Sequence, residues 1–200
     1  KFFGGKVLPT PHTNGKITTK GIKEHIIRRG DQHFSQVKMV SLTQPTEYGT
    51  CYSLQELKDI KALCIKEDLY LHIDGARIGN AAHFLETSLK DILSLADVAT
   101  IGGSKNGLLV GDLVLIYNEK LTEGFKFLRK QALQLPSKSR FMACQFLAYF
   151  KNQLWKEIAG HQCAMASYLG AKLKASQVEV TQPIESNAVF CRLPKDIIKK

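Results

Sequence analysis

The sequence lacks the features that mark several large classes of protein. It has five cysteines but no CxxC pair, so neither a disulfide framework nor a cysteine-rich metal site is expected. No apolar run approaches the roughly 20 residues that cross a bilayer, because the longest, Gly107 to Tyr117, is interrupted by Asp112. The first residues do not resemble a secretory leader. We therefore expect a cytoplasmic protein with no metal ion and no membrane partner.

The composition and charge fit a globular protein. The chain is 44% hydrophobic, which is enough to form a core, and its formal net charge is +10. Such an excess of basic residues can indicate binding to nucleic acid or to another anion. Here the basic residues are spread along the chain with acidic residues between them, and no nucleic-acid motif accompanies them. A solvated basic surface is the favoured interpretation, an anionic ligand is the alternative, and no nucleic-acid partner is expected.

Hydrophobic patterning predicts a βαβ unit followed by two further strands. Ser53 and Glu56 have the spacing of a capping box at the start of a helix. The nine residues from Gly102 to Val110 are too few for a parallel crossover, which needs about a dozen, so the last strand should be antiparallel. We expect helices over residues 18–29, 53–66 and 88–95, and strands over residues 37–43, 69–73, 97–101 and 111–117. The predicted fold class is α/β, with a mostly parallel mixed sheet flanked by helices.

The last third of the sequence is predicted to be mainly helical. Met142, Phe146, Phe150, Leu154 and Ile158 recur every four residues, which indicates a buried stripe on one long helix. Residues 177–183 break the pattern, a strand is expected over 187–193, and Pro194 would open another helix. We divide the chain into residues 1–136, part of a large domain, and residues 137–200, a connecting helix and the start of a small α+β domain. Since the first residues read as the interior of a longer protein, this segment alone is expected to be inactive.

Two segments carry the residues expected to perform chemistry. Asp74 ends an apolar strand, where ligands of open α/β sheets bind, and Arg77 follows it in a narrow turn. The alternative is a purely structural Asp74–Arg77 pair. Lys105 lies in a glycine-flanked loop after the next strand, where its amine could attack a carbonyl. The alternative for Lys105 is a surface turn lysine.

Taken together, the two segments suit a pyridoxal phosphate site. A lysine amine can form an imine with the aldehyde of this cofactor. The Asp74 carboxylate can pair with the ring nitrogen and keep the ring protonated. The Arg77 guanidinium can hold the carboxylate of an amino-acid substrate by two hydrogen bonds. The positive charge of the chain also suits the cofactor phosphate.

These residues resemble those of one enzyme family. Residues 72–82 (HIDGARIGNAA) and 102–107 (GGSKNG), with Lys105 placed 31 positions after Asp74, resemble the low-specificity L-threonine aldolases. This family belongs to the β-eliminating lyase group of the aspartate-aminotransferase fold, which is fold type I of the pyridoxal-phosphate enzymes. Residues 43–50 (TQPTEYGT) and 129–141 resemble a bacterial branch of it. The resemblance implies a lyase that splits threonine-type β-hydroxy-α-amino acids into glycine and an aldehyde.

The resemblance also implies roles for individual residues. Lys105 would carry the cofactor covalently, Asp74 would bind its ring nitrogen, and Arg77 would bind the substrate carboxylate. Gln44, Ser104 and Arg140 (or Lys130 in place of the arginine) are expected to contact the cofactor, with the basic residue reaching its phosphate. A homo-oligomer, dimer or tetramer, is expected by resemblance.

Several points stay open at this level. Gln44 stands where many members of the family have histidine, and an amide cannot act as a general base. His83, a water or the cofactor phosphate are the alternatives, with a helix-surface position favoured for His83. Two rival functions remain: β-elimination or transamination on the same scaffold, and an anion-binding or nucleic-acid-binding module without catalysis.

Overall fold

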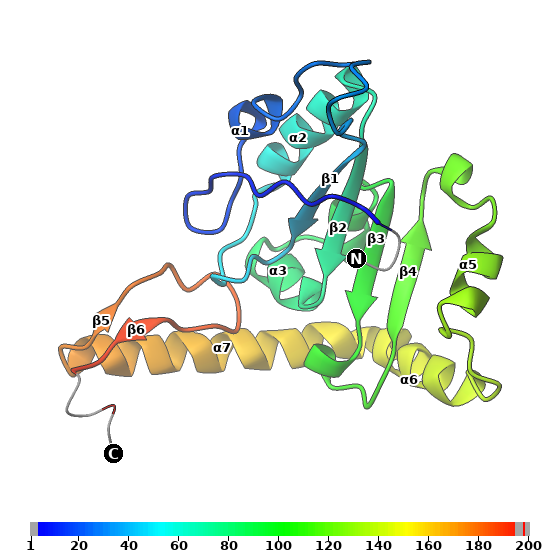
Figure 1. Cartoon of the computed structure of the whole chain (residues 1–200). Coiled ribbons are helices and arrows are strands. Elements are labelled where there is room, and N and C mark those ends of the chain that lie inside the picture. The colour runs from blue at the N-terminus through cyan, green and yellow to red at the C-terminus, as the bar shows by residue number, and fades with distance from the viewer. Residues whose placement is uncertain (1–3, 195–197, 199–200) are drawn as a thin grey trace.

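A four-stranded mixed sheet organises the protein (Figure 1). The structure, a computed structural model, describes residues 4–194 and residue 198. The strands β1 (Met39–Thr43), β2 (Tyr70–Gly75), β3 (Val98–Gly102) and β4 (Asp112–Ile116) lie in that order. The first three are parallel, and β4 runs antiparallel to β3. This arrangement confirms the predicted fold class and the argument that a nine-residue connection cannot return a parallel strand.

Three helices follow the strands of the parallel part. They are α2 (Leu54–Lys66), α3 (Ile78–Phe84) and α4 (Leu89–Leu93). The predicted capping box at the start of α2 is present, since the Ser53 side chain accepts from the Glu56 N–H and the Glu56 carboxylate accepts from the Ser53 N–H. Ser88 and Asp91 form a second capping box on α4. Each such cap contributes on the order of 1 kcal/mol to the stability of its helix.

The core lies on one face of the sheet. Alternate residues of β1 to β3 are buried there, namely Val40, Leu42, Leu71, Ile73, Ala99 and Ile101. They pack against buried side chains of α2, α3 and α4. On the opposite face Ser41, His72, Asp74 and Thr100 are half-buried or exposed. The period of two in burial is that of strands with one packed face, and it puts Asp74 on the open face.

The helices of the last third depart from the prediction. Instead of one helix there are α6 (Arg140–Phe150) and α7 (Leu154–Ala175), separated by the short 3-10 turn η3 (Lys151–Gln153). Asn152 and Gln153 have left-handed backbone angles, with φ of 53° and 58°, which end the first helix. Residues spaced by four advance about 40° around a helix at each step, so the predicted stripe winds away from the core. Of its five members Phe146 is buried at 6% exposure, whereas Phe150 and Leu154 are exposed.

Other predicted boundaries also shift. The helix expected over residues 18–29 is reduced to α1 (Thr19–Lys23), although Thr18 caps it as predicted. Arg28 has a φ of 49°, which a continuing helix could not accommodate. The strand expected over 187–193 shortens to β6 (Cys191–Arg192), which pairs with β5 (Glu179–Val180). The helix expected after Pro194 lies outside the described residues.

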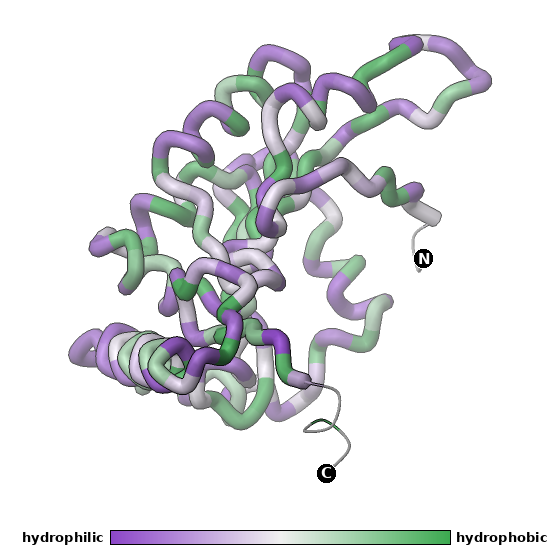
Figure 2. Tube along the Cα trace, turned by 90° about the vertical axis from the view of Figure 1, so that its left-hand side faces the viewer, coloured by the Kyte–Doolittle hydropathy of each residue, from purple (hydrophilic) through white to green (hydrophobic). Residues whose placement is uncertain are grey.

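The remaining elements surround the sheet. The short turns η1 (Ser104–Asn106) and η2 (Glu119–Leu121) flank β4, and α5 (Phe125–Gln131) follows them. In Figure 2 α7 is seen nearly along its axis and carries both hydrophilic and hydrophobic residues. No helix in the described ranges is long and apolar enough to cross a bilayer. The domain boundary expected near Ser137 stays a prediction.

Asp97 connects four elements at the end of the sheet opposite to Asp74. Its Oδ2 accepts hydrogen bonds from Lys61 Nζ of α2 at 2.7 Å and from the Leu71 N–H of β2 at 2.8 Å. Its Oδ1 accepts from Asn118 Nδ2 at 3.0 Å, just beyond β4. Asp97 is 8% exposed, and a carboxylate buried to that extent needs such partners.

Candidate functional site

Asp74 is half-buried at the carboxyl end of β2, as predicted. Its neighbours in the sheet are Thr43 of β1 and Thr100 of β3. The Asp74 Oδ1 accepts from the Ala76 N–H at 3.0 Å and, more loosely, from Thr100 Oγ1 at 3.5 Å. These bonds hold the carboxylate at the carboxyl end of β2, where ligands of parallel α/β sheets bind.

Lys105 lies in η1, three residues beyond the end of β3. The next residue, Asn106, is buried, and its Nδ2 donates to the Ala76 carbonyl at 3.1 Å and also to the Gly102 carbonyl. Ala76 thus donates to Asp74 through its N–H and accepts from Asn106 through its carbonyl. One residue therefore joins the turn after Asp74 to the loop that carries Lys105. Asn106 was missed as a site residue, because an asparagine next to glycines reads as an ordinary turn residue.

Two glycines allow this close approach. A Cβ on Gly75 would collide with the Thr100 carbonyl oxygen of the neighbouring strand. A Cβ on Gly102 would lie 3.1 Å from the Ala76 Cα, which is closer than ordinary van der Waals contact. Gly75 requires glycine because the backbone of the neighbouring strand passes next to it, and Gly102 favours glycine because the turn after Asp74 lies close to it.

The reactive atoms of the predicted pair are available to a ligand. Lys105 is exposed, and its Nζ has no hydrogen bond or ion pair with any residue that the structure describes. Within the same residues the Asp74 Oδ2 accepts no hydrogen bond, although Oδ1 is engaged. An amine and a carboxylate oxygen on two linked loops fit a cofactor with an aldehyde and a basic ring nitrogen.

Arg77 reaches the loop that follows β1. Its NH1 lies 3.6 Å from Glu47 Oε1, and the two side chains are 25% and 67% exposed. An ion pair this long and this exposed contributes little stability. The alternative of an Asp74–Arg77 pair is not what the described residues show, since the ion pair of Arg77 is with Glu47. The guanidinium can therefore exchange Glu47 for a ligand carboxylate.

Gln44 has a different environment from the one expected of a cofactor ligand. It is completely buried, and its Nε2 donates to the Tyr52 carbonyl at 2.8 Å while its Oε1 accepts from the Tyr52 N–H at 2.9 Å. Both functional atoms of the amide therefore hold the two ends of the Gln44–Tyr52 loop together. Because that loop carries Glu47, Gln44 shapes the surroundings of Arg77 through the backbone.

Glu185, which lies far along the chain, also holds the Gln44–Tyr52 loop. The Cys51 N–H donates to Glu185 Oε2 at 2.7 Å, and the Cys51 thiol donates to the Glu185 carbonyl at 3.1 Å. Burial, followed by the charge of Glu185, raises the pKa of the Cys51 thiol far above its ordinary value. Cys51 is thus an inert structural thiol.

His72 belongs to the motif at residues 72–82 but has no predicted role, and it lies on the same face of the sheet as Asp74. Its Nδ1 lies 2.8 Å from Ser41 Oγ on β1. Burial lowers the pKa of His72, and the negative charge of Asp74 opposes this shift. A neutral imidazole is therefore favoured next to the site.

Among the described residues, the side chains of the other predicted site residues make no hydrogen bond or ion pair with Asp74, Arg77 or Lys105. His83 is exposed on α3 and faces Gly160 of α7, which is the helix-surface position favoured from the sequence. Ser104 is exposed beside Lys105. Arg140 begins α6, and its guanidinium lies 5.2 Å from the Phe141 ring. Lys130 is exposed near the end of α5. Their roles toward a cofactor stay predictions.

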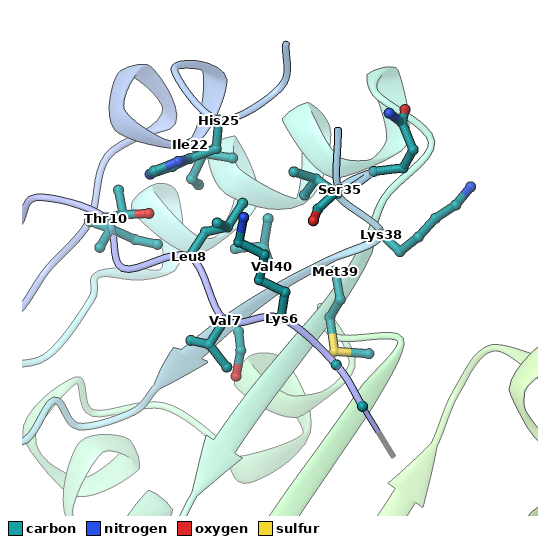
Figure 3. A pocket seen from close by; sticks show the side chains of 16 residues that line it. Lys6, Val7, Leu8, Thr10, Ile22, His25, Ser35, Lys38, Met39 and Val40 are labelled. Atoms are coloured by element: carbon teal, nitrogen blue, oxygen red, sulfur yellow. The ribbon is translucent and has the colours of Figure 1, made fainter. Parts of the chain in front are cut away.

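A cavity of about 570 Å³ lies elsewhere, between the N-terminal segment and β1 (Figure 3). Figure 3 shows Leu8, Ile22 and Val40 on its wall, with the Lys6 side chain extending between Leu8 and Val40 and Lys38 pointing outward at one side. Neither Asp74, Arg77 nor Lys105 lines it. We place the candidate site at the strand ends, because the turn after Asp74 and the loop that carries Lys105 are joined there through Ala76.

Comparisons with known proteins find several relatives of this chain. The family model described as beta-eliminating lyase matches residues 1–195. The chain is 39% identical to a low-specificity L-threonine aldolase of Pseudomonas aeruginosa, over all of this chain and 59% of that protein. It is 33% identical to one of Saccharomyces cerevisiae, over 97% of this chain and 52% of that protein. A solved Leishmania major threonine aldolase superposes with a TM-score of 0.93 at 33% identity, covering 98% of this chain and 58% of that one. The chain thus spans between half and three fifths of the length of these relatives.

Proposed function

Because this chain belongs to the beta-eliminating lyase family, we propose that its protein is a pyridoxal-phosphate-dependent aldehyde-lyase. The substrates would be threonine and allo-threonine, with glycine and an aldehyde as products. The observation that carries the proposal is the link through Ala76, which fastens the Lys105 loop to the turn after Asp74. The relatives that share this chain over its whole length are named threonine aldolases, which favours this reaction over β-elimination or transamination.

The residues of the site fit the proposed cofactor. Pyridoxal phosphate, when bound, supplies an aldehyde for a lysine amine and a protonated ring that accepts electrons from the substrate. Lys105 offers the amine, which is free of other partners among the described residues. Asp74 offers Oδ2 to the ring N–H while Ala76 keeps Oδ1 in place. A carboxylate at that position keeps the ring nitrogen protonated by pairing with its positive charge.

Arg77 would bind and orient the substrate carboxylate. Its present partner, Glu47, is a loosely held carboxylate at 3.6 Å, and a substrate carboxylate could accept two hydrogen bonds from the same guanidinium. Orientation matters because the bond to be cleaved must stand in a fixed direction relative to the ring. Gln44 is unsuitable as the base that accepts the hydroxyl proton of the substrate, since its amide is buried and paired with Tyr52.

We predict that Arg77→Gln raises the KM for threonine about 10- to 100-fold, since hydrogen bonds to a charged group contribute roughly 1.5–3 kcal/mol. Steady-state kinetics of the natural protein that contains this chain provides the measurement. Glu47→Gln is the matched control, because it removes the same ion pair from the other side. Its KM should be unchanged or lower. Equal increases in KM for both variants would show that Arg77 serves only to hold Glu47.

Product analysis tests the reaction itself. The protein is incubated with pyridoxal phosphate and threonine, and glycine and acetaldehyde are quantified by chromatography. Equal amounts of the two products are expected. Ammonia and a 2-oxo acid in place of glycine would instead favour β-elimination, and an amino group transferred to an added 2-oxo acid would favour transamination.

We further propose a homo-oligomer located in the cytoplasm. All five cysteines are free thiols, as is usual in a reducing compartment. Large apolar side chains are exposed on neighbouring helices, including Phe127, Phe141 and Leu147 at 69%, 58% and 74%. Such a concentration of exposed apolar surface is typical of a subunit interface.

A further inference from the structure

Two amide side chains connect the interior of the protein to the backbone of Lys105. Asn80 lies on α3 and is completely buried, and its Nδ2 donates to Gln162 Oε1 of α7 at 2.8 Å. The Gln162 Nε2 in turn reaches the Lys105 carbonyl oxygen at 3.4 Å. Three elements that are far apart in the sequence are thereby joined in one polar chain.

The carbonyl of Lys105 determines which atom donates and which accepts in each of these hydrogen bonds. A carbonyl can only accept, so Gln162 must present its NH₂ to Lys105 and its oxygen to Asn80. Asn80 must then present its own NH₂, which also lies 3.6 Å from Cys163 Sγ. As a result Asn80 Oδ1 is buried without a hydrogen-bond partner among the described residues. Turning the Asn80 amide over would place two oxygens against each other, so the orphaned oxygen is a consequence of serving Lys105.

The backbone of Lys105 is held on its other side as well. Asn106 donates to Ala76, next to Asp74, and Gly107 has a left-handed φ of 89° that ends the turn. A Cβ at Gly107 would lie 3.5 Å from Ile158 Cδ1 of α7, so α7 also contacts the loop directly. The loop is therefore fixed between α7 and the turn after β2, while the Lys105 side chain extends free of both.

We propose that Gln162 is a positioning residue for Lys105, with Asn80 orienting it. Helix α7 would thus set the place of the reactive amine through a side chain that touches neither substrate nor cofactor. The proposal rests on the proposed function for the role of Lys105, although the geometry it invokes exists without a cofactor. Since α7 continues to the β5–β6 pair, it also couples the C-terminal part of the chain to the site.

Two substitutions at position 162 and one elsewhere provide the test. Gln162→Met keeps the length of the side chain and removes both links. Gln162→Glu keeps the oxygen that accepts from Asn80 but loses the donor to Lys105. The matched control is Gln145→Met on α6, because Gln145 Oε1 accepts from the Leu109 N–H at 2.7 Å. That bond also joins a helix to the connection between β3 and β4, four residues beyond Lys105.

The first readout is hydrogen–deuterium exchange of the backbone amides of residues 103–107 without cofactor. Exchange should accelerate in both Gln162 variants and stay at the wild-type rate in Gln145→Met. The second readout is kinetics with bound cofactor. Displacement of a reacting group by about 1 Å can cost on the order of 100-fold in rate, so kcat should fall at least roughly tenfold in both Gln162 variants. The KM for threonine should change less than about twofold, because Arg77 is untouched.

The outcomes separate the two proposals. If the Gln162 variants match Gln145→Met in exchange, or if Gln162→Glu retains the wild-type exchange rate and kcat, then Gln162 does not position Lys105. If borohydride reduction of the wild-type protein with pyridoxal phosphate does not label Lys105, the proposed function fails. The exchange data would still decide whether Gln162 fixes the loop.

Discussion

Replacing Lys105 by alanine is expected to abolish the visible absorbance that pyridoxal phosphate gives in the wild-type protein. Activity toward threonine should fall by on the order of 10³-fold or more, as happens when the nucleophile of a covalent mechanism is removed. The physical reason is that, in the part of the chain that the structure describes, no other lysine lies in a loop that is joined to the Asp74 turn by a link of the kind that Asn106 makes. Absorbance spectra and product assays on the natural protein that contains this chain provide the measurement.

The same substitution should leave the fold intact, because Lys105 Nζ has no partner among the described residues. The free energy of unfolding should change by less than about 0.5 kcal/mol. Lys58→Ala is the control, since Lys58 is an exposed lysine of α2. It should keep the spectrum and the activity. A Lys105→Ala protein that retains both would refute the assignment of the reactive amine.

Replacing Asp97 by alanine should have the largest effect on stability. Lys61 Nζ, the Leu71 N–H and Asn118 Nδ2 would all lose their acceptor at a position that is 8% exposed. Breaking a buried ion pair from one side typically costs about 3–5 kcal/mol. Urea unfolding of wild type and variant measures this difference. Asp59→Ala, which removes an exposed carboxylate of α2, should cost less than about 0.5 kcal/mol, and an equal loss for both would contradict the role of Asp97.

The contribution of Asp97 should also depend on pH. Burial opposes its ionisation, but hydrogen bonds from Lys61, Leu71 and Asn118 outweigh burial and hold the pKa of Asp97 below its ordinary value. A lowered pKa in the folded state means that the stabilisation is complete above the unfolded pKa, about 3.9 for Asp. It is lost as the pH falls through the folded pKa. The stability difference between wild type and Asp97→Asn should therefore be constant above about pH 5 and shrink below about pH 4. A difference that stays constant down to pH 2 would contradict this.

Local patterns were sufficient to predict the sheet and the pair of segments at its edge. The capping box at Ser53, the β-branched strands and the short connection before β4 act within a few residues of one another, so they can be recognised without the structure. The rule that ligands bind beyond the ends of parallel strands then singled out Asp74 and Lys105. The structure links their loops through Ala76.

Features that depend on distant contacts could not be predicted. Gln44 is expected to contact the cofactor because it stands where many members of the family have histidine, and this stays a prediction. Its burial and its hydrogen bonds to Tyr52, eight positions away, appear only once the loop has folded. Asn80 and Gln162 are 82 positions apart, and neither belongs to a recognisable pattern. The break between α6 and α7 depends on left-handed residues, Asn152 and Gln153, that hydrophobic spacing does not report.

The bond between Cys51 and Glu185 has a consequence for biosynthesis. The two residues are 134 positions apart, and a ribosome adding about 5–20 residues per second needs roughly 7–27 s to make that stretch. During this interval the β1–α2–β2 unit can already form. The loop that carries Glu47 still lacks the hydrogen bonds between Cys51 and Glu185. The loop that carries Glu47 therefore receives its hydrogen bonds from the distal part of the chain only after Glu185 has been synthesised.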